Sequence, residues 1–207
     1  MKGVGCEIKD SAFTAAVYDF FLRPFESLLI QKWRRQLWEG VKGPRVLEAG
    51  VGTGLNIAHY SSDYHVTAVD LNESFLQRAY RKAKGKPVQV EFVLADVKSL
   101  PFPDHSFDTA VSTFLFCQLP DPMPGLTEIK RVLKPNGVLL MLEHVRPQGR
   151  LGGVISSLSG PLYLLTGEQI AHNTEGFTTT AGFTNVTSET LFGNMVKLIR
   201  AENDNYK

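Results

Sequence analysis

Short apolar runs alternate along the chain with longer amphipathic stretches, as they do in proteins that alternate strands with helices. The run at 138–145 is nearly all apolar, which predicts a strand buried on both faces of a parallel sheet. Near the C-terminus, 184–190 and 195–201 predict two strands in an antiparallel hairpin. These runs favour an α/β sheet, whose remaining strands are expected at 46–47, 65–70, 88–96 and 109–116.

Apolar residues at helical spacing predict helices between these strands. The stretch 10–39 is expected to be helical, with Pro24 bending it or beginning a second helix. Asn72 or Ser74 is placed to cap a helix that ends near residue 84. Further helices are expected at 55–60, 126–133 and 175–182. Between 146 and about 175 the pattern dissolves into Gly, Ser and Leu, which we interpret as a lid over an acceptor pocket.

The first strand runs into three glycines at alternate positions, Gly50, Gly52 and Gly54. Glycine tolerates positive φ and has no Cβ, so such a loop can turn tightly and bring its backbone against a ligand. The dinucleotide fingerprint would need glycine or alanine at position 55, where the chain has leucine. The Gly-Lys-Ser/Thr of the P-loop is also absent from this loop. The loop therefore predicts a nucleotide-like ligand of another kind.

Acidic residues mark the ends of the first three predicted strands. Glu48 precedes the glycine loop, Asp70 ends the second strand, and Asp96 ends the third. In α/β nucleotide-binding folds, an acid about 20 residues after the loop accepts hydrogen bonds from ribose hydroxyls, and Asp70 has that spacing. Three acids in order at strand ends form a more specific signal than the glycines alone.

The motif from Glu48 to Gly54 resembles motif I of class I S-adenosylmethionine (SAM) methyltransferases, E/D-x-G-x-G-x-G. The stretches 100–108 and 133–137 resemble further segments of that family. The resemblance implies a Rossmann-like fold with a mostly parallel seven-stranded sheet, an antiparallel C-terminal strand and helices on both faces. It also implies SAM as cofactor, with Asp96 near the adenine amino group. The implied cofactor-binding residues are Tyr18, Glu48, Gly50, Gly52, Gly54, Asn56, Asp70, Leu71, Asp96, Val97 and Ser112.

Methyl transfer from a sulfonium depends on positioning and desolvation, so a dedicated catalytic residue is not required. His144, at the end of the fifth strand, is a candidate to take a proton or orient the acceptor, or else a structural histidine. Tyr18 is the second candidate; the resemblance implies that its hydroxyl helps hold the methionine carboxylate, the alternative being a core tyrosine. Cys117 is expected to pack as a small apolar residue. His172 and Asn173 either line the pocket or cap the next helix.

The segments around Ser112 and His144 resemble bacterial phosphatidylethanolamine N-methyltransferases and the membrane-associated thiol methyltransferases of animals. Quinone C-methyltransferases resemble the chain more distantly and are expected to be longer. The resemblance thus implies an amphipathic acceptor, first of all the head-group amine of phosphatidylethanolamine. The alternatives are a thiol, a quinone or another small molecule, or a SAM-binding regulator without catalysis.

With 207 residues the chain is expected to form one domain, spanning 1–207, with cap helices at about 10–39. A net charge of +1 argues against a nucleic-acid partner, and five histidines without paired spacing argue against a metal site. Two cysteines and no long apolar window favour a cytoplasmic protein. Aromatic and basic residues in 10–39 add the expectation of peripheral membrane contact; those basic residues include Lys32, Arg34 and Arg35, next to Trp33 and Trp38.

Overall fold

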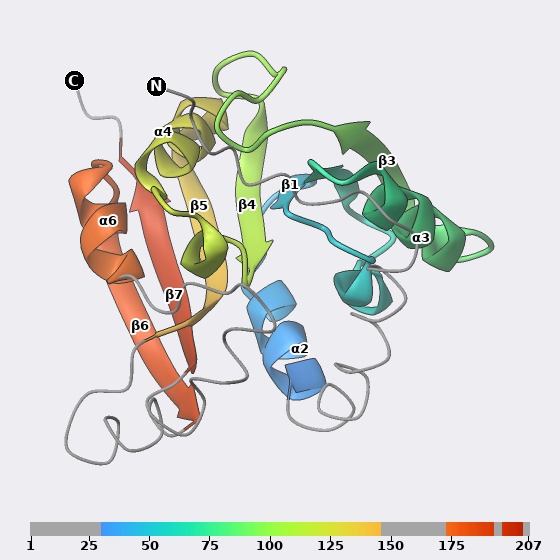
Figure 1. Cartoon of the computed structure of the whole chain (residues 1–207), viewed down its shortest axis with the longest axis horizontal. Coiled ribbons are helices and arrows are strands. Elements are labelled where there is room, and N and C mark those ends of the chain that lie inside the picture. The colour runs from blue at the N-terminus through green and yellow to red at the C-terminus, as the bar shows by residue number, and fades with distance from the viewer. Residues whose placement is uncertain (1–29, 146–172, 193–195, 205–207) are drawn as a thin grey trace, which may run out of the picture.

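The computed structural model describes residues 30–145, 173–192 and 196–204. Its centre is a seven-stranded sheet in the order β3-β2-β1-β4-β5-β7-β6 (Figure 1). Every strand expected from the apolar runs is present. In chain order the strands are β1 (Arg45–Ala49), β2 (His65–Asp70), β3 (Gln89–Leu94), β4 (Phe107–Thr113), β5 (Leu133–His144), β6 (Thr184–Phe192) and β7 (Val196–Asn203).

Strand direction confirms the expected mixed sheet. The pairs β1–β2, β2–β3, β1–β4 and β4–β5 are parallel, whereas β7 is antiparallel to both β5 and β6. From β1 the chain moves outward to β2 and β3, then returns to place β4 on the other side of β1. Strand order therefore reverses between β1 and β4. In open α/β sheets, ligands bind outside the carboxyl ends of the strands at such a point.

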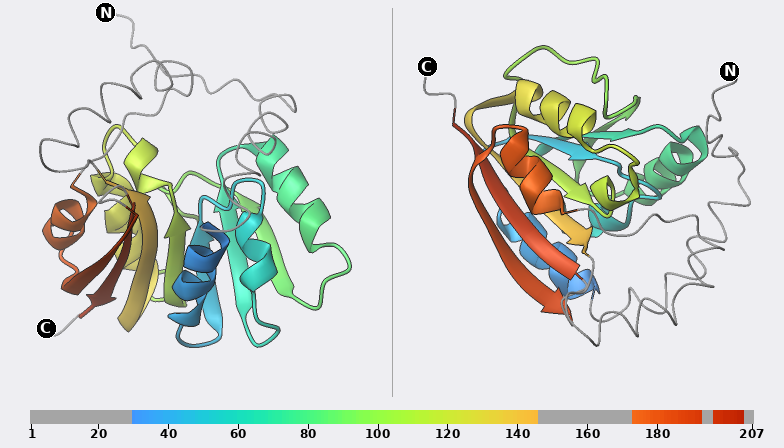
Figure 2. Two further views of the ribbon diagram at one scale, coloured as in Figure 1. Left: turned by 90° about the horizontal axis from the view of Figure 1, so that it is seen from below. Right: turned by 60° about the vertical axis from the view of Figure 1, so that its left-hand side comes forward.

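Helices cover both faces of the sheet, as expected (Figure 2). One face carries the helix α2 (Gln31–Glu39), the short 3₁₀ helix η2 (Leu55–His59) and α3 (Glu73–Ala83); the other carries α4 (Met123–Val132) and α6 (Thr174–Thr180). Because side chains alternate along a strand, each face has its own apolar cluster. In β5, for example, Leu140 and Leu142 join the α2 side while Leu139 and Met141 join the α4 side.

Local sequence explains how the helices begin. The Asn72 side chain accepts a hydrogen bond from the Phe75 N–H at 3.1 Å, which confirms one of the two predicted caps of α3. Asn173 caps α6 in the same way, accepting from the Gly176 N–H at 3.1 Å, so the capping alternative holds for this residue. In α4 the predicted apolar side is fully buried at Leu126, Ile129 and Val132.

Three predicted boundaries are wrong. The fifth strand begins at Leu133, five residues before the predicted start at 138, whereas the helix expected at 55–60 is present as the 3₁₀ helix η2. The fourth strand ends at Thr113, because Phe114 adopts φ +54° and turns the chain out of the sheet. The third strand ends at Leu94, so Asp96 lies just beyond it in an isolated bridge with Ser99.

Several expectations lie outside the described residues. These concern Tyr18, His172, the helices expected before residue 30 and the lid expected from 146. In the ranges that the structure describes, we find no helix that is long and apolar enough to span a membrane.

Candidate active site

The glycine loop follows β1 at the carboxyl edge of the sheet. Gly50, Gly52 and Gly54 all have positive φ, at +72°, +55° and +79°. At Gly52 an added Cβ would meet no atom within 4 Å, so this backbone faces open space. At Gly54 an added Cβ would lie 2.5 Å from Ile57 Cδ1 and 2.9 Å from Ala79 Cα. The first feature leaves room for a ligand, and the second brings the loop close to α3.

Asp70, at the end of β2, reaches across to this loop. Its carboxylate accepts hydrogen bonds from the Gly52 N–H at 2.8 Å and the Asn72 N–H at 2.9 Å. Burial raises the pKa of the Asp70 carboxyl, and the backbone donors oppose that rise. The acid predicted to bind ribose is thus placed beside the middle glycine, and it holds that glycine in position.

A buried polar network lies beneath the loop, on the α2 side of β1. Asn56 donates from Nδ2 to Glu48 Oε1 at 2.6 Å and to Thr113 Oγ1 at 3.0 Å. Arg34 in α2 donates to Asn56 Oδ1 at 2.7 Å. The Tyr60 hydroxyl donates to the second oxygen of Glu48. The network therefore joins α2, β1, η2 and β4 under the place where the loop turns.

Glu48 and Asn56 are 1% and 2% exposed, so both are enclosed under the loop. Burial is the main cause that raises the pKa of Glu48 to about 7, against the hydrogen bonds from Tyr60 and Asn56 and the charge of Arg34. These contacts assign both side chains to supporting the loop. Their predicted direct contact with the cofactor stays a prediction.

The predicted adenine side lies at the ends of β2 and β3. Leu71 and Leu94 are 61% and 56% exposed, so two large apolar side chains face outward at this edge. Asp96 accepts the Lys98 N–H at 2.9 Å, and Val97 beside it is buried. Ser112 is fully buried in β4, and its hydroxyl meets no polar partner in the part of the chain that the structure describes. The predicted roles of these residues stay predictions.

A second constellation forms where β4 and β5 end. The His144 ring stacks on Phe114, with ring centroids 4.3 Å apart and planes 15° apart. The Arg34 guanidinium lies over the Phe114 ring at 5.9 Å, and Cys117 Sγ lies 4.0 Å from His144 Nδ1. Burial lowers the pKa of His144 to about 4, so its imidazole is neutral at physiological pH. The histidine predicted from sequence therefore sits in an aromatic, partly buried setting.

Glu143 supports this constellation from the opposite face of β5. Its buried carboxylate accepts the Phe116 N–H at 3.1 Å and the Cys117 N–H at 3.0 Å. Burial raises the pKa of Glu143, and the hydrogen bonds from the 3₁₀ helix η3 (Phe116–Gln118) oppose that rise. Cys117 is 4% exposed, in keeping with the expected packing role. Glu143 thus fixes the chain just after the Phe114 turn.

Sequence reasoning missed four residues of this site: Arg34, Tyr60, Thr113 and Phe114. Arg34 was predicted to face a membrane together with Trp33 and Trp38, but all three are buried at 5%, 8% and 3% exposure. That prediction is wrong, because this face of α2 packs against the core cluster and η2. The apolar spacing of α2 could have indicated the burial of Arg34. No sequence signal pointed to the left-handed Phe114 or to the bond between Tyr60 and Glu48.

Comparison with known proteins shows which family the chain belongs to. A family model described as a methyltransferase domain matches residues 47–141. The phosphatidylethanolamine N-methyltransferase of Cereibacter sphaeroides is 36% identical over 149 residues, which cover 70% of this chain and 71% of the relative. The ubiquinone/menaquinone biosynthesis C-methyltransferase UbiE of Yersinia pestis is 31% identical and covers 96% of this chain and 90% of the relative. The alignment with UbiE runs over 228 residues, more than the 207 of this chain, so the expectation that quinone enzymes are longer is confirmed.

Solved structures agree on the fold. The phosphoethanolamine N-methyltransferase 2 of Haemonchus contortus, solved with S-adenosyl-L-methionine, has a TM-score of 0.73 at 16% identity, covering 96% of this chain and 59% of that one. A SAM-dependent methyltransferase of Thermotoga maritima has a TM-score of 0.68 at 20% identity, covering 93% and 96%. The chain belongs to the class I SAM-dependent methyltransferases. It is an enzyme of that family, and SAM is its cofactor.

The residues present fit SAM. Gly52 offers open space at a backbone with positive φ, Asp70 stands beside it, and Leu71 provides an exposed apolar side chain at the same edge. Gly52 would face the methionyl part of the cofactor, Asp70 would bind the ribose, and Leu71 would lie against the adenine. When bound, SAM supplies a methyl group already activated by its positive sulfur. The protein then has to bind and orient the two reactants and exclude water.

Proposed function

We propose that this methyltransferase methylates the head-group amine of phosphatidylethanolamine. The relative from Cereibacter sphaeroides, which bears that activity in its name, supports the proposal. The observation that carries it is the stack of Phe114 on a neutral His144 at the ends of β4 and β5. An uncharged imidazole can accept a hydrogen bond from an amine without repelling the cationic product, and the stack on Phe114 fixes the orientation of that imidazole.

The charge balance of the reaction explains why an uncharged imidazole is useful beside the acceptor nitrogen. A protonated amine has no lone pair, so the head group must first lose a proton to solvent or to a base. The neutral nitrogen then forms a bond to the methyl carbon as the carbon–sulfur bond breaks. Sulfur becomes neutral and nitrogen becomes a cation, so positive charge moves toward the acceptor. His144, held in place by its stack on Phe114, would orient the remaining N–H.

The low pKa of His144 sets its role in this proposal. A group that titrates at about 4 holds a proton poorly at neutral pH, so it is a weak general base. We therefore assign His144 to orienting the amine by accepting a hydrogen bond. The substitution His144→Asn should lower kcat/KM for the lipid while leaving SAM affinity within about twofold, because an amide oxygen can accept one bond but does not stack as well.

A quinone is the second candidate acceptor. The UbiE relative of Yersinia pestis matches a larger share of this chain than the phosphatidylethanolamine enzyme does. A planar quinol could stack on the half-buried His144 ring of the same pair. Carbon methylation would then require loss of a ring proton, for which the neutral His144 is a candidate acceptor.

The test is an acceptor panel. Purified full-length protein would be incubated with methyl-labelled SAM and, in separate reactions, phosphatidylethanolamine vesicles, a quinol and a thiol. We expect label in the phospholipid, with Phe114→Leu lowering that transfer at least tenfold and leaving SAM binding intact. Label in the quinol alone would replace the proposal with the quinone alternative. Label in the thiol alone would exclude both.

A further inference from the structure

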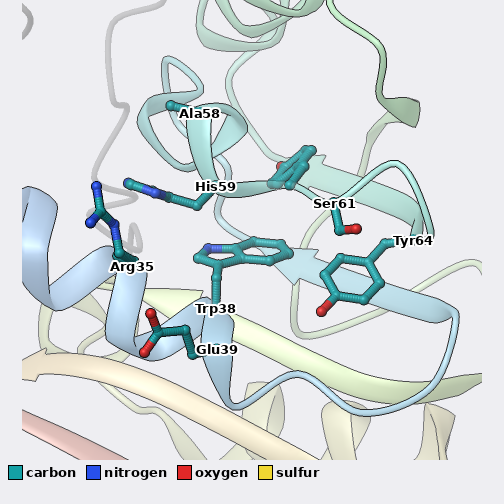
Figure 3. A pocket seen from close by; sticks show the side chains of 8 residues that line it. Arg35, Trp38, Glu39, Ala58, His59, Ser61 and Tyr64 are labelled. Atoms are coloured by element: carbon teal, nitrogen blue, oxygen red, sulfur yellow. The ribbon is translucent and has the colours of Figure 1, made fainter.

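A cleft on the α2 side of the sheet lies apart from the glycine loop. It has a volume of about 270 Å³ and lies between the second half of α2 and the chain that runs from η2 to β2. Because α2 leads into the start of β1, this cleft is toward the amino ends of the strands, away from the carboxyl edge that carries the loop. Figure 3 shows Arg35 and Glu39 on one flank of Trp38 and Tyr64 on the other.

The cleft contains an unused buried donor. Trp38 is 3% exposed, and its indole N–H has no hydrogen-bond partner in the described ranges. In Figure 3 the indole nitrogen is on the side of the ring that faces Arg35 and His59. An indole nitrogen can only donate, and a buried donor without an acceptor is unfavourable. A ligand oxygen in the cleft would satisfy it.

The charges around that donor favour an anion. Arg35 is exposed and takes part in no ion pair within the described chain. Burial, and then the positive charges of Arg34 and Arg35, lower the pKa of His59, so two cationic side chains lie near this part of the cleft. His59 itself lies 2.9 Å from Gln31 through Nε2, so it is held in place beside the cleft.

The other lining groups favour a cation close to that anion. Glu39 follows Arg35 by one helical turn, so the two side chains emerge on the same face of α2. Neither is paired with the other in the structure. The rings of Tyr60 and Tyr64 lie 4.6 Å and 6.4 Å from that of Trp38, and the Trp38 ring stands between Tyr64 and the Glu39 carboxylate. A carboxylate beside aromatic rings is a setting in which ammonium groups bind.

We propose that this cleft between α2 and η2 binds a zwitterionic phosphate–ammonium group, with the phosphate on Arg35 and the Trp38 N–H, and the ammonium on Glu39 and the aromatic rings. The ligand class deepens the proposed function, because an ethanolamine head group has this charge pattern, and the choice of probe rests on that function. The cleft would be a second subsite that holds a head group without methylating it. Such a subsite would help retain the enzyme on its lipid.

Binding can be measured without methyl transfer. Protein with ¹⁵N-labelled tryptophan would be titrated with phosphoethanolamine and, separately, with inorganic phosphate, while the Trp38 indole N–H signal is followed; Trp38→Phe assigns it. We expect a saturable shift of that signal with phosphoethanolamine. Arg35→Gln should weaken both probes at least tenfold. Glu39→Gln should weaken phosphoethanolamine several-fold and leave phosphate unchanged or tighter.

The matched control is Lys32→Gln, which removes an exposed charge from the same helix outside the cleft and should change either affinity less than twofold. Absence of any saturable Trp38 shift would overturn the proposal, as would a shift that survives Arg35→Gln. If Glu39→Gln changes the affinities for phosphate and phosphoethanolamine equally, the cleft binds only an anion, and the zwitterion assignment is overturned. Vesicles of phosphatidylethanolamine in place of the free head group show whether the lipid itself is the source. None of these outcomes depends on which acceptor is methylated.

Discussion

Two buried ionisable residues at the site make opposite contributions to pH-dependent stability. The pKa of Glu48 is raised from 4.5 to about 7, so the folded state holds this proton more tightly than the unfolded state does. The free energy of unfolding should therefore fall as pH rises from about 4.5 through 7. The pKa of His144 is lowered from 6.5 to about 4, so its contribution falls as pH drops through that range. Between these limits the two trends oppose each other.

Replacing one of these two residues should reveal the effect of the other on the pH dependence of stability. With Glu48→Gln, the loss on the order of 3 kcal/mol assigned to Glu48 disappears, so the free energy of unfolding should fall less, or rise, between pH 4.5 and 6.5 compared with the wild type, because the His144 contribution is then no longer opposed by Glu48. Urea unfolding at a series of pH values measures this. His144→Asn is the companion variant and should steepen the decline toward neutral pH. An unchanged pH profile in Glu48→Gln would show that the Glu48 carboxyl does not titrate in this range.

Asp70 carries the second prediction at this scale. Asp70→Ala removes the acceptor of the Gly52 and Asn72 N–H groups as well as the expected ribose contact. SAM binding should weaken by about 1.5–3 kcal/mol, roughly 10- to 150-fold, the range for hydrogen bonds to a charged group. Calorimetric titration with SAM checks this. Asp70→Asn separates the two roles, because its amide can still accept one loop N–H. Equal SAM affinity in folded Asp70→Ala and wild type would remove Asp70 from the site.

At the scale of the element, substitutions at two glycines of the loop should affect SAM binding and stability to different extents. Gly52→Ala puts a methyl group into open space at positive φ and should cost about 1 kcal/mol of stability, yet greatly weaken SAM binding. Gly54→Ala meets the same strain and also clashes with Ile57 and the Ala79 backbone, so it should destabilise more. Thermal unfolding and SAM titration of the pair test this ranking. Normal SAM binding by Gly52→Ala would mean that the cofactor approaches elsewhere.

Strands were predictable from sequence, whereas the ends of β4 and the buried network were not. Apolar runs bounded by glycine, proline or acids fix where a buried strand can lie, so all seven were found with small errors at their ends. The turn at Phe114 depends on contacts from Glu143 and the next strand, which local sequence does not encode. Arg34 was misplaced because a basic residue next to tryptophans on a helix looks the same whether the helix meets lipid or its own core.

For the whole molecule, membrane association remains a prediction, and within α2 it is now limited to the predicted basic residues that are exposed. The exposed basic residues of α2 are Lys32 and Arg35. Each basic residue near an anionic surface contributes about 1 kcal/mol, so Lys32→Gln with Arg35→Gln should weaken binding to anionic vesicles roughly 30-fold. Co-sedimentation at low and high salt measures it.

Lys84→Gln with Lys86→Gln is the control, since these exposed lysines after α3 carry the same charge away from α2. Equal losses in both pairs would indicate a net-charge effect and not docking through α2. If the wild type sediments with no vesicles at all, the lipid acceptor loses its support from this surface.

The division of the core by the sheet also sets how substitutions combine. Ile57 belongs to the α2 cluster and Ile129 to the α4 cluster, and both are almost fully buried. Each Ile→Val change should cost about 0.5–1.5 kcal/mol, and the double variant should cost the sum within about 0.5 kcal/mol. Denaturant unfolding of the three variants would reveal any coupling. Since Glu48, Asn56 and Arg34 lie on the side of the first cluster, a change deep in the α4 layer, such as at Ile129, needs no compensating change in the buried network beneath the glycine loop.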